Sequence, residues 1–584
     1  MRIKRLLIAS AVAIAIPALA QQVAQTQSAP AAAPPTATAP QPQPSISATT
    51  DDLSSGGADE TAVEEVSQPA AVVPVRPPVE YPGWARRDPW VVGKLDPAAL
   101  GLGDNPWGGQ SGAFLTTLMR RMNTPIGSRW AHIALRDALL AKARAPRDVN
   151  PVDWVAERSW LLLRMGEADA ARMLVDGVDT DRFTPKMVQV AVQTALATAD
   201  AAALCPLEPG LRTNESQIRP FVQGMCAALA GDADSASAQI DDARRHGRIG
   251  GIDLSLPQKV IGAAGTGRAA TIDWGPVDSL TAWRFGLAAA TGMAPPDRLM
   301  NASSPQVRAF EARAPLLSPQ QRLAPALFAA GLGVFSSQSL VDLYSAIYDA
   351  TDPSDVPTTD AWQLREAFVG KDEPARLAAI RHLLGVGKDR LQKEGTRALV
   401  ARAATLVNPD AKLAKDAPDL ISAMLAAGYD RAAARWIRAV SRMDDDNGDR
   451  CWAMLALGAP DVADVGTGRI TAFIGRDKSP HKVRSAFLVA GLAGLGRIST
   501  DTAVSLNRRY GLGLGTVTSW TRAMDAAAGS GQAGTVLVLT GTGFQTPFWD
   551  KVPAAHLYHA ITALEHTGQD FTARMIAAEA LSRT

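Results

Sequence analysis

The sequence predicts an all-α protein built from short antiparallel helix pairs. In Trp160–Leu174 an apolar stretch that suits the end of a helix is followed by Gly166, four mixed residues and Ala171. Glycine at a helix C-terminus takes the left-handed conformation that ends the helix, and alanine lets the next helix approach closely. The same pattern recurs at Gly231/Ala236, Gly265/Ala270, Gly428/Ala433, Gly458/Ala463 and Gly568/Ala573.

The spacing of these turns indicates the size of the structural unit. From Gly428 onward the turn glycines recur at intervals of roughly 30 to 38 residues, the length of a helical-hairpin repeat. The interval from Gly166 to Gly231 is about twice as long, and Ala199 lies near its middle. The longer interval before Gly428 contains only the candidate turns Gly331/Gly333 and Gly385/Gly387.

With these glycine and alanine pairs the chain resembles the tetratricopeptide (TPR) and related α-solenoid families. In those families a helix pair turns at glycine, and an alanine packs in the second helix. Most copies here lack the Trp, Leu-Gly and Tyr of the TPR first helix, so the resemblance is TPR-like. It implies an α-solenoid of antiparallel hairpins whose concave surface binds protein partners.

The N-terminus has the three parts of a secretory signal peptide. Basic residues precede an apolar run, Leu6–Ile16, and Ala18-Leu19-Ala20 supplies a cleavage site after Ala20. The apolar run is too short to span a membrane, so no transmembrane segment is expected after cleavage, and the absence of a cysteine at the site argues against a lipoprotein. The expected location is the periplasm, and the Ala, Arg and Asp usage is typical of GC-rich Gram-negative bacteria.

A low-complexity linker is expected to follow over 21–80. It is rich in Gln, Ala and Pro, then acidic from Asp51 to Glu65, with few large apolar side chains for a core. Without the three basic residues of the signal peptide, 56 of the 59 basic residues remain against 58 acidic ones, a net charge near −2. A neutral balance of this kind offers no electrostatic footprint for nucleic acid.

The rest of the chain divides into an entry segment, 81–150, and two helical-repeat lobes, 151–355 and 356–584. Three tryptophans, Trp84, Trp90 and Trp107, are concentrated at the start of the entry segment. The first interpretation is that they anchor this segment on the first helices, because each can bury up to about 200 Å². The alternative is a stacking platform for a sugar or a peptide.

The chain contains three cysteines, and an exported compartment permits disulfides. Cys205 and Cys226 are separated by a loop long enough to bring them together, so either a disulfide or two buried free thiols fits the sequence. Cys451 has the setting of an inert residue in the core of a helix.

No stretch of the sequence carries a convincing catalytic, cofactor or metal motif. Asp444–Asp449 resembles a calcium loop, but methionine stands at the first and last ligand positions, so a solvated turn is expected. Gly109–Ala113 misses the nucleophile-elbow pattern. His556 and His559 lie one helical turn apart without a third ligand at close spacing. No catalytic residue, cofactor or metal is therefore assigned.

Three functions remain open. The first is an exported helical-repeat scaffold or adaptor for protein partners in the cell envelope, because the repeats, the neutral charge and the missing motifs agree. The second is an enzyme that acts on cell-wall glycan, or a superhelical domain of one, although no catalytic glutamate stands in a recognisable setting. The third is a sugar- or peptide-binding protein that uses Trp84, Trp90 and Trp107.

Overall fold

The structure, a computed structural model, describes residues 82–584 except 124, 215, 247–248, 266–269 and 462–464. The signal peptide 1–20, its cleavage site after Ala20 and the linker 21–80 lie outside the described residues. Residues Arg87–Thr584 form one compact unit. Residues 82–86, which do not belong to this unit, form a short 3₁₀ turn, η1 (Gly83–Ala85), with Trp84 exposed.

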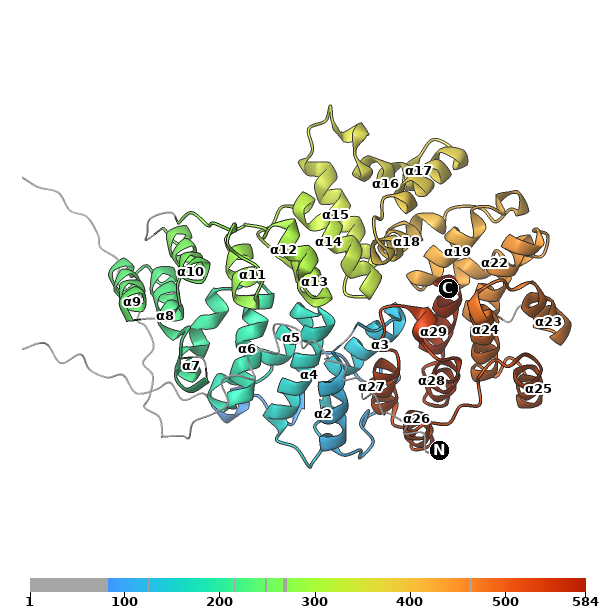
Figure 1. The fold of residues 1–584 in the computed structure, drawn as a ribbon, viewed down its shortest axis with the longest axis horizontal. Helices are drawn as coiled ribbons and strands as arrows, with labels where there is room; N and C mark the ends of the chain where they lie inside the picture. The colour runs from blue at the N-terminus through green and yellow to red at the C-terminus, as the bar shows by residue number, and fades with distance from the viewer. Residues whose placement is uncertain (1–81, 124, 215, 247–248, 266–269, 462–464) are drawn as a thin grey trace, which may run out of the picture. The chain divides into compact units, whose positions relative to one another are not determined.

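The larger unit consists almost wholly of α-helices, which confirms the all-α prediction (Figure 1). The helices are α2 (Gly112–Arg121), α3 (Arg129–Leu140), α4 (Pro151–Met165), α5 (Ala168–Val175), α6 (Pro185–Ala197), α7 (Glu208–Asn214), α8 (Arg219–Leu229), α9 (Ala233–His246), α10 (Ile252–Ala263), α11 (Ala282–Ala289), α12 (Asp297–Ala302), α13 (Pro305–Arg313), α14 (Pro319–Leu332), α15 (Ser337–Ala350), α16 (Asp360–Val369), α17 (Glu373–Gly385), α18 (Arg390–Ala404), α19 (Ala417–Ala426), α20 (Asp430–Ala434), α21 (Ile437–Val440), α22 (Asp445–Gly458), α23 (Thr467–Arg476), α24 (Val483–Gly494), α25 (Thr500–Tyr510), α26 (Ser519–Gly529), α27 (Ala533–Gly543), α28 (Ala554–His566) and α29 (Asp570–Ser582). Short 3₁₀ segments join some of them: η2 (Thr180–Arg182), η3 (Ala202–Leu207), η4 (Val356–Thr358), η5 (Ala411–Leu413), η6 (Pro480–Lys482) and η7 (Trp549–Lys551).

The entry segment contributes a small antiparallel pairing that the sequence did not predict. Strand β1 (Val91–Val92) pairs with β2 (Ala143–Arg144), which follows α3. The buried Arg158 of α4 fixes this pairing, because its guanidinium donates hydrogen bonds to Val92 O at 2.8 Å and to Leu139 O at 3.0 Å. These contacts fasten the first residues of the unit to α3 and α4.

Several helix pairs are joined by the glycine turn that the repeated pattern predicts. Gly166, Gly231, Gly428 and Gly568 all have positive φ. In each turn the amide after the glycine donates to the carbonyl five residues back, as in Gln569 N to Leu564 O at 2.8 Å. The partner alanines are buried in the following helix: Ala171, Ala236, Ala433 and Ala573.

Two of the predicted turns have a different structure. Gly458 is the last residue of α22 and does not take positive φ; a side chain there would meet Leu425 at 2.9 Å and Ala578 at 3.0 Å, so it serves close helix packing. Its partner Ala463 lies outside the described residues. At Gly265/Ala270 no hairpin forms, because residues 270–281 are not helical.

The helices on the two sides of residue 355 pack closely. Helices α14 and α18 cross where both carry glycine. A Cβ on Gly331 would lie 2.1 Å from Leu391 O, and a Cβ on Gly395 would lie 2.0 Å from Leu327 O. Gly331 is therefore a packing position inside α14, whereas Gly333 is the left-handed residue that ends this helix. At this crossing the backbones of the two helices are in close contact.

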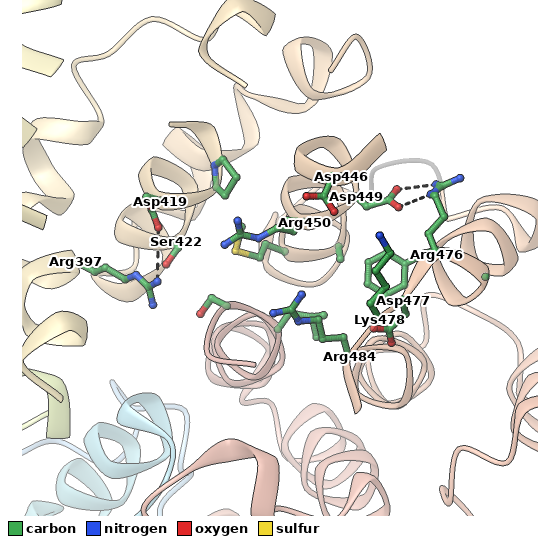
Figure 2. A pocket seen from close by; sticks show the side chains of 17 residues that line it. Arg397, Asp419, Ser422, Asp446, Asp449, Arg450, Arg476, Asp477, Lys478 and Arg484 are labelled. Carbon is green, nitrogen blue, oxygen red and sulfur yellow. Dashed lines mark hydrogen bonds and ion pairs between the residues drawn. The ribbon is translucent and has the colours of Figure 1, made fainter. Parts of the chain in front are cut away.

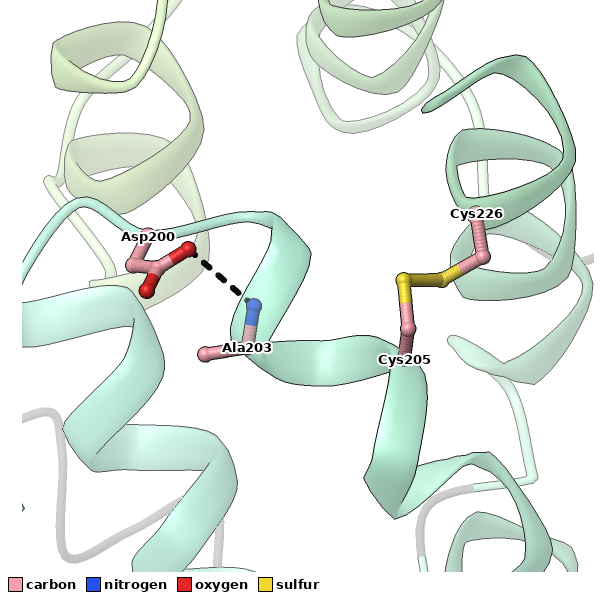
Figure 3. Close-up of a disulfide and its surroundings, with 4 residues drawn as sticks. All are labelled: Asp200, Ala203, Cys205 and Cys226. Carbon is pink, nitrogen blue, oxygen red and sulfur yellow. Dashed lines mark hydrogen bonds between the residues drawn. A yellow bond between two sulfur atoms is a disulfide. The ribbon is translucent and has the colours of Figure 1, made fainter. Parts of the chain in front are cut away.

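A disulfide joins Cys205 of η3 to Cys226 of α8, as Figure 3 shows. The residues between them contain α7, where the sequence suggested a loop. The two cysteines are separated by 21 positions in the sequence. Closing a loop of this size lowers the conformational entropy of the unfolded chain, which stabilises the folded state by about 3 kcal/mol in the loop-entropy model.

The last helix, α29, lies among helices from distant parts of the chain, and it packs on α3, α19, α22, α24 and α28. Glu579 of α29 accepts hydrogen bonds at the N-terminus of α3, from the Arg129 amide at 2.7 Å and the Ser128 hydroxyl at 2.5 Å. Arg583 donates to Gly127 O and to Gly331 O. Helices near the start and the end of the unit are thus directly joined.

Candidate functional site

A polar cleft of about 480 Å³ lies among α18, α19, α22, α23, α24 and α29. This volume falls within the range of small-ligand sites. Figure 2 shows charged side chains entering the cleft from several helices. The lining residues include Arg397, Asp419, Ser422, Asp446, Asp449, Arg450, Arg476, Asp477, Lys478, Arg484 and Ser582.

Helix α22 supplies one wall of the cleft. Asp444 begins this helix, because its carboxylate accepts a hydrogen bond from Asn447 N at 2.9 Å. Asp446, Asp449 and Arg450 follow at three- and four-residue spacing, which places them on one face of the helix. The acidic run that resembles a calcium loop is therefore a helix cap and first turn rather than the expected solvated turn.

The segment between α23 and α24 forms the opposite edge. The Asp477 carboxylate accepts hydrogen bonds from Ser479 N at 2.8 Å and from Ser485 N at 2.9 Å. Burial alone would raise the pKa of Asp477, but hydrogen bonds from Ser485 and Ser479 outweigh it and hold the pKa below its usual value. This anchored turn fixes Lys478 at the edge of the cleft.

Most acidic side chains of the cleft are already engaged. Asp449 forms a bidentate pair with Arg476, at 2.7 and 2.9 Å, and a further ion pair with Arg469 at 2.7 Å. Asp419 lies 3.6 Å from Arg397. Only the exposed Asp446 has no partner within the described part of the chain. The acidic groups thus leave the remaining cations largely uncompensated.

Three cations of the cleft pair with no carboxylate side chain among the described residues. Arg450 and Lys478 are exposed, and neither side chain makes a hydrogen bond or ion pair with a described residue. Arg484 donates from Nη2 to Thr584 O at 2.6 Å, while its buried Nε finds no acceptor in the protein. Ser422 is 5% exposed, and its hydroxyl has no protein partner either.

The lining of the cleft consists mainly of charged side chains of both signs, and it contains neither histidine nor cysteine. The nearby Cys451 is buried, and burial raises the pKa of its thiol to about 12, which keeps it protonated and inert. Across the described residues, no group of three His, Cys, Asp or Glu side chains is placed to hold a metal.

The three tryptophans of the entry segment do not form one surface. Trp107 is 1% exposed and packs edge-on against Trp154, with ring centroids 5.2 Å apart. Trp90 is partly buried beneath the Arg144 guanidinium. Trp107 therefore anchors the entry segment, as the first interpretation expects, and a stacking platform of all three residues is not present.

The other residues that the sequence marked for chemistry have structural partners. His556 stacks on Trp520, and His559 lies 2.7 Å from an Asp525 oxygen. Ser111 caps α2 and donates to Asp148 at 2.7 Å. None of them lines the cleft. The cleft itself escaped prediction, because Ser422, Arg450 and Arg484 belong to ordinary helical stretches that only the fold brings together.

In comparisons with known proteins, the chain matches no family model, no curated protein and no solved structure. Among the described residues, no helix combines the length and the apolar composition needed to cross a membrane.

Proposed function

We propose that this chain is an exported, periplasmic helical-repeat scaffold that binds protein partners of the cell envelope. The cleft among α18, α19, α22, α23, α24 and α29 carries this proposal, because it offers polar and charged groups that six helices hold in place. The signal-like N-terminus supports the export, and the shared glycine turns support a TPR-like solenoid of antiparallel hairpins.

The proposal predicts that a partner protein touches the rim of the cleft in the cell. Gly475 lines the cleft, and a Cβ there would meet no atom within 4 Å, so a photoreactive amino acid fits at this position. Gly529 of α26 has the same open surroundings but does not line the cleft, which makes it a matched control. Irradiated cells should yield a discrete protein adduct from position 475 and none from position 529.

Two results would contradict the proposal. One is the absence of any adduct that distinguishes position 475 from position 529. The other is release of soluble glycan fragments when the purified protein is incubated with cell wall, which would identify an enzyme instead.

A further inference from the structure

In the cleft, most acidic side chains have partners within the protein, whereas two basic side chains do not. Asp449, Asp419 and Asp477 are each held by partners within the protein. Arg450 and Lys478 are not paired with any described residue. An oxyanion entering here would meet cations that need not first break an ion pair, so its binding would keep the existing contacts of the cleft intact.

Arg484 lines the same space as Arg450 and Lys478. Its bond from Nη2 to Thr584 O fixes the guanidinium, and its backbone amide donates to the Ser479 hydroxyl at 3.1 Å. The Nε atom remains without an acceptor although it is buried.

Ser422 of α19 forms part of the wall of the cleft, and its hydroxyl is buried. A serine within a helix commonly donates to a carbonyl one turn earlier, but the Ser422 hydroxyl does not. The side chain is 5% exposed and lines the same cleft as Arg484. In Figure 2, Arg450 and Arg484 extend into the space that Ser422 borders.

We propose that this cleft binds an acidic side chain of a partner peptide, with Arg450, Arg484 and Lys478 holding the carboxylate. The inference rests on the proposed scaffold function and names the chemistry of its partner. A planar guanidinium matches a carboxylate with two parallel donors, which favours this pairing over a neutral amide. The unpaired Asp446 at the rim opposes a ligand of high negative charge density.

The test measures binding of fluorescein-labelled peptides to the full mature chain by anisotropy. A glutamate-rich peptide should bind, while the glutamine-rich peptide of the same length and a lysine-rich peptide should not. Affinity should fall as salt rises from about 0.05 to 0.5 M, because screening weakens exposed cations most. Equal binding of the glutamate- and glutamine-rich peptides would overturn the proposal.

Substitutions inside and outside the cleft test where the peptide binds. Arg450→Gln/Lys478→Gln changes two exposed side chains and should weaken binding at least about tenfold. The matched control is Lys142→Gln/Arg182→Gln, which alters two exposed cations outside the cleft and should bind as the parent does. Equal affinity of the cleft and control variants would overturn the proposed location.

A competition experiment separates a peptide from a free anion. Inorganic phosphate and free glutamate, each at the concentration of the labelled peptide, should displace little of it. Full displacement by either would mean that the cleft takes a small anion, and the peptide proposal would be wrong. If the peptide fails to bind but adducts persist at Gly475, the scaffold function stands without this ligand chemistry.

Discussion

Ala199 takes a positive φ of 52° at a turn where the equivalent residues are glycine. The amide of Asp200 donates to Ala195 O at 2.9 Å, the same hydrogen bond that follows Gly166 and Gly568. The left-handed conformation costs an alanine about 1–2 kcal/mol. The packing around this turn therefore holds a conformation that the residue itself disfavours.

Replacing turn glycines should separate backbone strain from packing. Gly568→Ala introduces strain only, since nothing lies within 4 Å of the added Cβ, and should cost about 1–2 kcal/mol. Gly166→Ala has the same strain, and its Cβ would meet Ala309 at 2.8 Å, so overpacking should add about 1–3 kcal/mol. Urea unfolding of both variants measures the difference, and equal losses would contradict the packing argument.

Glu311 of α13 should make stability depend on pH. The side chain is 8% exposed, and burial, followed by the nearby Asp297, raises its pKa from 4.5 to about 7. Between these values the folded chain holds a proton that the unfolded chain releases, so stability falls as pH rises through this window.

Glu311→Gln removes this ionisation. The variant should match the parent near pH 4.5 and exceed it by up to about 3 kcal/mol above pH 7. Urea unfolding over this pH range measures the difference. A constant offset for Glu311→Gln at all pH values would disprove the titration.

Among helix contacts, the crossing of α14 and α18 depends most directly on glycine. Gly395→Ala should destabilise by about 1–3 kcal/mol, because its Cβ would lie 2.0 Å from Leu327 O and backbone atoms cannot rotate away. Gly385→Ala, at the end of α17, meets no atom within 4 Å and should be neutral or stabilising by up to about 1 kcal/mol. Thermal melts of the two variants should move in different directions.

The helices themselves were largely accessible to sequence reasoning, and their long-range contacts were not. Apolar spacing and the glycine pattern give α4 and α5 directly, because both signals are local. The sequence predicts a turn at Gly458, but the residue is a close packing position, because glycine before a polar stretch suits both a turn and a close helix contact. No local sequence pattern marks Ser422 and Arg484 as cleft residues, because whether they line a cleft depends on which helices the fold brings together.

Across the whole unit, Glu579 links α29 to α3 through hydrogen bonds at a helix N-terminus. Glu579→Gln should cost about 3 kcal/mol, because it removes a buried charge that faces three donors and Arg583. Asp570→Asn is the control, since its ion pair with Arg574 involves a carboxylate that is 62% exposed and should matter by less than about 1 kcal/mol. Similar melting temperatures for both variants would refute the linking role.

The bond between Ser128 and Glu579 spans a sequence separation of 451. In an open repeat array each unit needs only its neighbours, so folding can start anywhere and spread. Here Ser128 caps α3 locally by accepting a hydrogen bond from Ala131 N, but the amides of Arg129 and Trp130 donate to Glu579, which is synthesised hundreds of residues later, and closing so long a loop slows folding. Truncated chains that stop before α29 are therefore expected to leave α3 frayed and open to proteolysis, however complete their local helices are.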